Sequence, residues 1–404
     1  MPLTPPTPLP SRRLKRRLLL GAALAVVTAI SGCSGSSLDT DDAGDGTLTI
    51  GLVWPQSGPY ETIGVDQARG WQLYLDSHGG KLGGLTVKTP ATDEGSGAPT
   101  ALAAAKKLVD ADQATVLVGT ASGETNAAIA QYATDRKLPF VGAGGRASVI
   151  KDVTWVWNTS WLSKEMGAAV APYIAQTVKG PVYAIGPDYQ GGWDQMGGFT
   201  DKFIASGGKL ANSDGKTTWT PWPATKNYLP FLSKIADTDA KAVYTFYAGT
   251  SAVDFVKQYQ QSGLKLPLYA AGFLTEGAVL EAQGAAATGV YTVLNYAANL
   301  DNPANRAFAP AYQQKHGTAP TIFSVAGWDA ALVLDQAITA AGPNPTPKAI
   351  NDAIGKLGTV ASPRGDWRFG GQHSPIQAYY LRQVKPDGRT QANVVQQTLT
   401  TLSN

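Results

Sequence analysis

Short apolar segments alternate with longer segments of helical periodicity along most of the chain. From residue 47 onward, the apolar runs predict buried strands, and the segments between them predict amphipathic helices. The first series has strands at 48–53, 85–89, 115–118 and 139–143 and helices at 64–78, 99–110 and 124–136. The second series has strands at 182–185, 242–246 and 268–271 and helices at 194–205 and 251–262. Such alternation is typical of parallel sheets covered by helices on both faces, and two series predict two α/β lobes.

The N-terminal segment has the pattern of an export signal. Basic residues between positions 12 and 17 precede an apolar run at 18–29 and the sequence Ile30-Ser31-Gly32-Cys33. This order predicts a secretory signal peptide over residues 1–32, because the apolar run is shorter than the roughly 20 residues that span a bilayer. The sequence Ile-Ser-Gly-Cys at 30–33 resembles the lipobox of bacterial lipoproteins, which implies cleavage before Cys33 and lipidation of the Cys33 thiol. A stretch rich in Gly, Ser and Asp at 33–46 predicts a flexible tether.

Removal of the predicted signal peptide changes the sign of the net charge. The whole chain has 33 basic and 30 acidic residues, a formal charge of +3. Residues 1–32 hold five of the basic residues and none of the acidic ones, so 28 basic and 30 acidic residues remain, or −2. Because the basic residues are scattered, we expect no nucleic-acid partner. Cys33 is the only cysteine, so we expect no disulfide.

Residues that could carry catalysis or bind a metal are sparse in the sequence. The three histidines, His78, His316 and His373, are far apart, and none of them pairs with another at the spacing of a metal site. Ser122 lies in Thr-Ala-Ser-Gly and lacks the G-x-S-x-G elbow of a hydrolase. The acidic residues of the tether lack the glycine and the distal glutamate of a calcium loop. We therefore expect neither an enzyme nor a cofactor or metal site.

Four motifs resemble those of branched-chain amino acid-type periplasmic binding proteins. GLVWPQSGPY at 51–60 resembles the opening of that family, and VGTAS at 118–122 resembles the end of one of its strands. The other two are GWDA at 327–330 and an ending made of SPRG at 362–365, HSPIQ at 373–377 and YLRQV at 380–384. The likeness extends from residue 47 to 384. It implies a type I two-lobe α/β clamshell and a solute-binding lipoprotein of an ABC transporter.

The resemblance also implies how the chain divides between the two lobes. The family has three chain crossovers, which we place near 158–161, 291–293 and 362–367. Lobe one then combines 47–160 with 292–362, and lobe two combines 161–291 with 363–404. The ligand is expected between the lobes, which close around it by a hinge rotation.

Ser122 is the first candidate contact for a ligand carboxylate. It follows a predicted strand and precedes a predicted helix, whose first turn presents unpaired N–H groups. Its hydroxyl could instead cap that helix, but the resemblance favours the ligand, because the family's carboxylate-binding serine occupies this position.

In the glycine-rich loop after the next strand, we expect Ala143 and Gly145 to offer backbone donors. Gly145 stands where the family usually has threonine, and Arg146 is either a bidentate carboxylate ligand or a solvated loop residue.

The second lobe offers aromatic and acidic candidates. A DYQGGW sequence resembles a family loop whose aromatic ring closes over the ligand, and either Tyr189 or Trp193 supplies that ring. Tyr247 follows a predicted strand at the expected edge of the cleft, and Tyr60 ends the opening motif. In the family, an acid on the loop that holds Glu276 pairs with the ammonium group of an amino acid, a charge that needs a counter-ion when buried. The resemblance makes Glu276 the candidate for that acid, unless Thr275 occupies the position. Alternatively, Glu276 only lies at the start of a helix.

These features predict the ligand-binding component of an ABC importer. Its ligand is a small carboxylate, in first place a branched-chain or other amino acid. The alternatives are an aromatic or other organic acid on the same scaffold, or a ligand sensor in place of a transport component. We expect a monomer at the outer face of the cytoplasmic membrane, held only by the lipid on Cys33, that meets permease subunits with their ATPases. The basic cluster also fits a twin-arginine signal, so the export route stays open.

Overall fold

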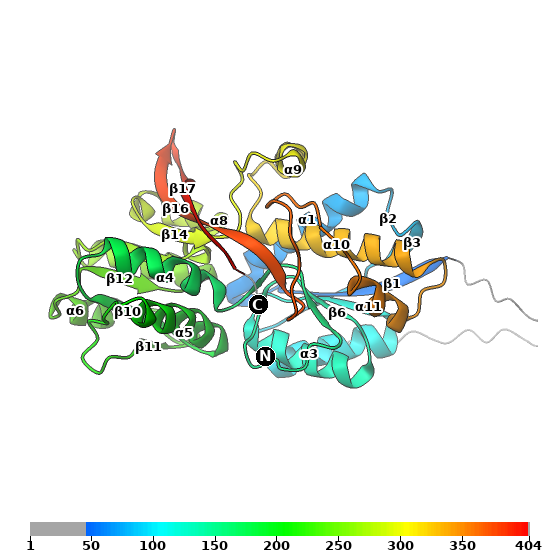
Figure 1. Ribbon diagram of the computed structural model, residues 1–404, viewed down its shortest axis with the longest axis horizontal. Helices are drawn as coiled ribbons and strands as arrows, with labels where there is room; N and C mark the ends of the chain where they lie inside the picture. The colour runs from blue at the N-terminus through cyan, green and yellow to red at the C-terminus, as the bar shows by residue number, and fades with distance from the viewer. Residues whose placement is uncertain (1–45, 403–404) are drawn as a thin grey trace, which may run out of the picture. The chain divides into compact units, whose positions relative to one another are not determined.

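The computed structural model describes residues 46–402, which belong to one compact unit and form two α/β lobes (Figure 1). Each lobe has a mostly parallel sheet with helices on both faces. This architecture confirms the fold class predicted from the alternation of strands and helices. The predicted signal peptide, Cys33 and all but the last residue of the predicted tether lie outside the described residues.

The sheet of lobe one contains seven of the described strands. They are β1 (Thr47–Trp54), β2 (Lys81–Leu82), β3 (Leu85–Lys88), β4 (Ala91–Asp93), β5 (Val116–Gly119), β6 (Phe140–Gly142) and β8 (Val156–Asn158). Their order is β2-β3-β1-β5-β6-β8, and β4 pairs with the second half of β1. The ladders are parallel apart from that between β2 and β3. The carboxyl ends of β5 and β6 therefore lie side by side, and the loops after them meet at the same edge of the sheet.

Successive side chains of the central strands point into two different cores. Val116 and Val118 pack with α1 (Glu61–Ser77) and α10 (Ile322–Ala341), whereas Leu117 packs with α2 (Ala98–Lys106) and α3 (Gly123–Arg136). Figure 1 shows α1 and α10 on one side of this sheet and α3 on the other. Helix α10 is long and apolar enough to span a membrane, but most of its side chains are buried in the core of the lobe. The remaining helical segments of lobe one are η1 (Gly58–Tyr60), η2 (Lys107–Ala111), α9 (Pro303–His316) and α11 (Pro347–Ile354).

The sheet of lobe two contains eight of the described strands. They are β10 (Val182–Asp188), β11 (Thr218–Pro221), β12 (Ala242–Thr245), β13 (Leu268–Ala271), β14 (Tyr291–Leu294), β15 (Arg368–Phe369), β16 (Pro375–Asp387) and β17 (Thr390–Leu402). Their order is β11-β10-β12-β13-β14-β16-β15, and β17 pairs with β16. A separate two-stranded sheet pairs β7 (Gly145–Arg146) with β9 (Trp161–Leu162) next to the first crossover.

The helices of lobe two also divide between the faces of its sheet. Apolar residues of α4 (Glu165–Thr177) and α5 (Gln190–Ala205) pack on one face. Those of α6 (Leu229–Ala236), α7 (Gly249–Gln261) and α8 (Ala278–Gln283) pack on the other. Short helices η3 (Gly272–Thr275) and η4 (Gly284–Ala287) flank α8. Because α5 follows β10 directly, its N-terminus lies at the carboxyl edge of the second sheet.

Strand β14 corrects the predicted position of the second crossover. We expected the chain to return to lobe one at 291–293, but Tyr291–Leu294 pairs with β13 and β16 inside the second sheet. The crossover therefore follows Leu294. A second feature that the sequence pattern did not predict is the hairpin of β16 and β17, two antiparallel strands of 13 residues each. Strand β17 is half-exposed along most of its length and mostly polar, so it lacks the apolar run that marks the buried strands.

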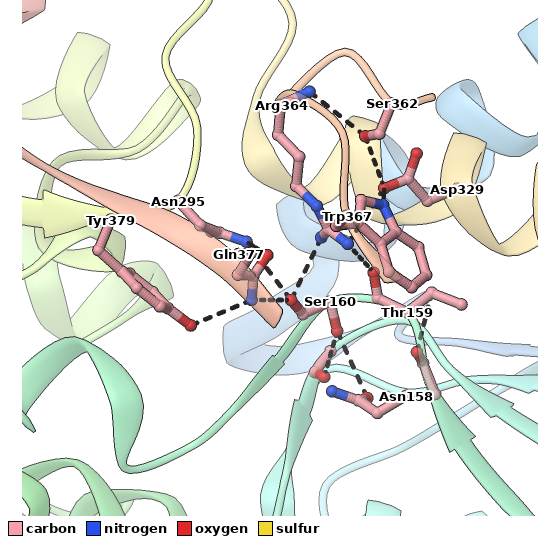
Figure 2. Close-up of polar contacts among 12 residues, drawn as sticks. Asn158, Thr159, Ser160, Asn295, Asp329, Ser362, Arg364, Trp367, Gln377 and Tyr379 are labelled. Atoms are coloured by element: carbon pink, nitrogen blue, oxygen red, sulfur yellow. Dashed lines mark hydrogen bonds and ion pairs between the residues drawn. The ribbon is translucent and has the colours of Figure 1, made fainter. Parts of the chain in front are cut away.

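The three chain segments that connect the lobes meet at one backbone oxygen. The carbonyl oxygen of Ser160 accepts hydrogen bonds from Arg364 at 3.2 Å, Gln377 at 2.7 Å and Asn295 at 3.4 Å (Figure 2). Arg364 is fully buried and lies 3.3 Å from the Asp329 carboxylate of α10, which forms its ion pair. Asn295 after β14, Arg364 before β15 and Gln377 in β16 thus all bind the backbone of the first crossover where the lobes join.

Candidate functional site

A cavity lies between the two lobes and is lined mainly by aromatic rings. Its volume is about 40 Å³, which is room for several water molecules. The aromatic residues that line it are Tyr60, Trp161, Tyr189, Phe246, Phe273 and Phe323. Among the described residues, no Asp, Glu, Lys or Arg lines this cavity. Its walls therefore suit a flat, mainly apolar ligand.

Two helices direct their N-terminal ends at this cavity. Gly123 is the first residue of α3 in lobe one, Gly191 is the second residue of α5 in lobe two, and both line the cavity. A Cβ atom on Gly123 would lie 3.6 Å from the backbone nitrogen of Gly191, so the two helix ends lie face to face. The first turn of a helix presents N–H groups without intrahelical acceptors and the positive end of the helix dipole. The cavity is therefore suited to an anion even without a cationic side chain.

Tyr60 and Tyr189 connect the lobes beside the helix ends. Their hydroxyl oxygens lie 2.7 Å apart, and both rings stack on Trp222, with centroids 5.7 and 4.9 Å from its ring. Burial raises the pKa of both phenols above the usual value of 10, so both stay protonated. One hydroxyl donates to the other, and the acceptor keeps its own hydrogen for a ligand.

Polar side chains surround Gly145 on another wall of the cavity. A Cβ atom on Gly145 would lie 2.7 Å from Ser163 Oγ and 2.9 Å from Trp161 Nε1, and both residues line the cavity. Gln195 lines it as well, and its buried Oε1 atom has no hydrogen-bond partner among the described residues. A larger residue at position 145 would therefore require Ser163 and Trp161 to move, because their hydrogen-bonding side chains fill the space next to the glycine.

A buried carboxylate occupies part of the N-terminus of α3. Glu94 Oε2 accepts from the backbone N–H of Ala121 at 2.7 Å, and its Oε1 accepts from that of Ser122 at 2.9 Å and from the Thr125 hydroxyl. The Glu94 side chain is fully buried, and burial raises its pKa to about 7, although its hydrogen bonds lower it. The chain itself thus supplies an anion next to Gly123.

The predicted carboxylate residues of lobe one lie in different places. Gly145 lines the cavity, whereas Ser122, Ala143 and Arg146 are not among its described lining residues. The backbone N–H of Ser122 donates to Glu94, and that of Ala143 donates to the Gly119 carbonyl at 2.8 Å. The buried Arg146 guanidinium donates to the Gln372 carbonyl, and burial lowers its pKa to about 10. Arg146 is therefore not a solvated loop residue.

In lobe two, the structure distinguishes between the aromatic candidates. Tyr189 lines the cavity, whereas Trp193 is 48% exposed and donates to Asp188 at 2.8 Å. Tyr247 is buried in the core of lobe two, where its hydroxyl lies 2.9 Å from Thr220 Oγ1. Its neighbour Phe246 lines the cavity instead. Phe246 and Tyr247 are consecutive residues just after β12, so an error of one position is enough to exchange the two.

Glu276 is already paired within the protein. Its carboxylate lies 3.0 Å from the buried Arg382 guanidinium and accepts from the backbone N–H of Ile322 at 3.0 Å. It lines a second, smaller cavity of about 10 Å³ together with Asp66. The two cavities share Ile63, Phe273 and Phe323 as lining residues. Glu276 is therefore separated from the larger cavity by an apolar wall.

Several cavity residues were missed from the sequence alone. Trp161 and Ser163 follow the first crossover, Phe273 lies in η3, and Phe323 lies in the first turn of α10. Nothing in the sequence spacing of Phe273 and Phe323 marks them as lining one cavity. Within residues 46–402, no group of three or more His, Cys, Asp and Glu side chains could hold a metal ion.

Comparison with known proteins assigns the chain to a family. A family model described as periplasmic binding protein matches residues 47–389. The chain belongs to the periplasmic binding protein family. Among curated proteins, it is 27% identical over 356 residues to the Leu/Ile/Val-binding protein homolog 6 of Brucella melitensis, which covers 86% of this chain and 90% of the relative.

Two solved structures resemble this periplasmic binding protein over nearly its whole length. A solute-binding protein of an ABC transporter from R. palustris, in complex with benzoate, is 30% identical with a TM-score of 0.83, covering 89% of this chain and 98% of the other. Another, from Rhodopseudomonas palustris HaA2 in complex with p-hydroxybenzoic acid, is 27% identical with a TM-score of 0.80, covering 89% and 98%. The resemblance to branched-chain amino acid-type binding proteins stated from sequence motifs is confirmed at the level of the family.

Proposed function

We propose that this protein binds an aromatic carboxylate between its lobes and presents it to an ABC importer. The observation that carries the proposal is the convergence of the N-termini of α3 and α5 on an aromatic-lined cavity. A carboxylate gains N–H donors and two favourable helix dipoles there. An aromatic ring gains flat walls for stacked or edge contacts. The benzoate complex of the 30% identical R. palustris protein supports this choice.

The same cavity is less suited to the ammonium group of an amino acid. A buried cation needs a nearby counter-charge, and the described lining of the cavity contains none. Glu276, the expected partner, is neutralised by Arg382. The proposal therefore departs from our first expectation of an amino acid and adopts the alternative of an aromatic acid.

A branched-chain amino acid is the second candidate. The cavity that adjoins the first across Ile63, Phe273 and Phe323 is lined by Asp66 and Glu276. If the phenylalanine side chains turned, these carboxylates could reach a ligand ammonium group. The Leu/Ile/Val-binding protein homologs of Brucella support this candidate.

The proposed mechanism is closure of the lobes around the ligand. Tyr60, Gly123 and Trp161 would meet one side of the ligand, and Tyr189, Gly191 and Phe246 the other, so a ligand that contacts both lobes favours the closed form. The hinge for this closure would lie at the crossovers, where the side chains that bind the Ser160 carbonyl connect the segments (Figure 2). The ATPase and permease subunits would belong to other chains.

We further propose that the protein is a lipoprotein at the outer face of the cytoplasmic membrane, anchored through Cys33. The support is the order of basic cluster, apolar run and Ile-Ser-Gly-Cys in the sequence. Labelling of cells with radioactive palmitate is expected to mark the protein, and Cys33→Ser is expected to abolish the label. Equal labelling of the variant would rule out this anchor.

Thermal unfolding of the purified protein with benzoate, 4-hydroxybenzoate, leucine and isoleucine tests the ligand class. A ligand at 100 times its dissociation constant stabilises the folded state by about 2.7 kcal/mol. We expect the two aromatic acids to raise the melting temperature and the amino acids to leave it unchanged. Benzamide, which has the ring without the charge, serves as the control. A shift with leucine alone would favour the second candidate and overturn the first.

A further inference from the structure

Glu94 is a buried carboxylate that shares a helix N-terminus with the proposed ligand. Its two oxygens bind the backbone N–H groups of Ala121 and Ser122. The next N–H along the chain belongs to Gly123, which lines the cavity. A ligand carboxylate at Gly123 and the carboxylate of Glu94 would therefore lie at the same turn of α3.

The hydrogen bonds around Glu94 can accommodate a proton. The Thr125 hydroxyl has one hydrogen but two acceptors within reach, Glu94 Oε1 and the carbonyl oxygen of Ser122 at 2.9 Å. When the Thr125 hydroxyl donates to the Ser122 carbonyl, it cannot also donate to Glu94 Oε1. Protonated Glu94 can then donate from Oε1 to the Thr125 oxygen, which keeps the close contact between these two atoms as a hydrogen bond. Both carboxyl oxygens can still accept their backbone N–H groups. Neutral and ionised Glu94 therefore fit the same geometry.

The charges around Glu94 do little to hold it ionised. Burial is the largest cause of the rise of its pKa to about 7, and Asp93, the preceding residue at the end of β4, raises it further through like charge. Glu124 lies in the first turn of α3, where it accepts from the Ala98 N–H at 3.2 Å. Tyr60 and Tyr189 face the same region as neutral phenols. On α2, the basic residue Lys106 lies at the far end of the helix, away from Ala98.

We propose that binding of a carboxylate at Gly123 and Gly191 is coupled to uptake of one proton by Glu94. A second anion at the same helix end disfavours the ionised form of Glu94, because like charges raise each other's pKa. The proton comes from solvent and forms an O–H bond on the Glu94 carboxyl, so the net charge buried at the site does not change when the ligand enters. This inference rests on the proposed function, since it requires an anionic ligand in the cavity.

Titration calorimetry of the protein with benzoate, in two buffers of equal pH and different heats of ionisation, tests the coupling. Benzoate stays ionised near pH 8, because carboxylic acids titrate near pH 4. We expect the observed heat to differ between phosphate and Tris by an amount that corresponds to a large fraction of one proton taken up. We also expect the affinity to fall, by up to tenfold per pH unit, as pH rises above 7. Equal heats in both buffers would overturn the proposal.

Glu94→Gln and Glu124→Gln are the matched variants, since both remove one carboxylate near the start of α3. Glu94→Gln is expected to make the heat independent of the buffer, whereas Glu124→Gln is expected to behave like the unaltered protein. A buffer dependence that persists in Glu94→Gln would assign the proton to another group. If Glu94→Gln does not fold, the calorimetry of the unaltered protein still decides whether a proton is taken up, and Thr125→Val then tests its position. Absence of benzoate binding would contradict the proposed function, whereas binding without proton uptake would contradict only this inference.

Discussion

The hydroxyl groups of Tyr60 and Tyr189 lie 2.7 Å apart, and this hydrogen bond joins lobe one to lobe two beside the cavity. Both rings also stack on Trp222, so the bond lies in an apolar surrounding. A hydrogen bond between lobes exists only when the lobes are close together. It therefore contributes to ligand affinity through the closed form rather than through the stability of either lobe alone.

Tyr60→Phe and Tyr189→Phe are each expected to weaken benzoate binding. A neutral hydrogen bond contributes about 0.5–1.5 kcal/mol, and the double variant is expected to lose little more than either single one. Tyr247→Phe is the control, because that hydroxyl binds Thr220 within lobe two. Calorimetric titration of the unaltered protein, the two single variants and the double variant gives the coupling energy between the two hydroxyls. Fully additive losses would show that the two hydroxyls act independently.

Gly191→Ala is expected to lower benzoate affinity about tenfold, or roughly 1.4 kcal/mol. Its Cβ atom would lie 2.8 Å from the Tyr189 hydroxyl and 2.9 Å from the ring, so Tyr189 must move away from Tyr60. Gly197→Ala on the same helix is the matched control, because a Cβ there meets no described atom within 4 Å. Alanine favours helix in both variants, so urea unfolding should show no loss of stability from helix propensity. An unchanged affinity of Gly191→Ala would mean that the position of Tyr189 is unimportant for the ligand.

The sequence predicted the lobes and the carboxyl edge of the first sheet, because strand and helix periods are local properties. It did not predict which polar groups the fold itself uses. Ser122 lies where a carboxylate was expected, but the carboxylate bound to its N–H is that of Glu94, 28 residues earlier in the chain. Likewise, Glu276 pairs with Arg382, a partner 106 residues away. Such pairings depend on the three-dimensional approach of distant segments, and no spacing in the sequence reports them.

Glu276→Gln is expected to destabilise the protein while leaving benzoate affinity unchanged. Removal of one partner leaves the buried Arg382 charge uncompensated, which typically lowers the free energy of unfolding by about 3–5 kcal/mol. Glu281→Gln on α8 is the control, since Glu281 is exposed. Urea unfolding and calorimetric titration measure the two properties separately. Loss of leucine binding in Glu276→Gln, with stability retained, would instead identify Glu276 as the ammonium partner.

The free energy of unfolding is expected to fall as pH rises from about 5 to 8. Burial raises the pKa of Glu94 from 4.5 to about 7 and that of Asp66 from 3.8 to about 6. The folded protein therefore binds these protons more tightly than the unfolded chain. This stabilisation is complete below about pH 4, and it is lost as the pH rises through the folded pKa values, to about pH 8. His316 and His373 act in the opposite sense, because burial lowers the pKa of each.

Asp66→Asn tests the contribution of Asp66 to this pH dependence. The variant is expected to show a smaller difference in unfolding free energy between pH 5.5 and pH 8 than the unaltered protein, because its side chain no longer titrates. Asp152→Asn is the control, since Asp152 is exposed and its hydrogen bonds to Thr154 lower its pKa still further below this window. Urea unfolding at the two pH values, followed by far-ultraviolet circular dichroism, gives the comparison. A free energy of unfolding that rises toward pH 8 in the unaltered protein would contradict the prediction, because groups with a lowered pKa would then outweigh Glu94 and Asp66.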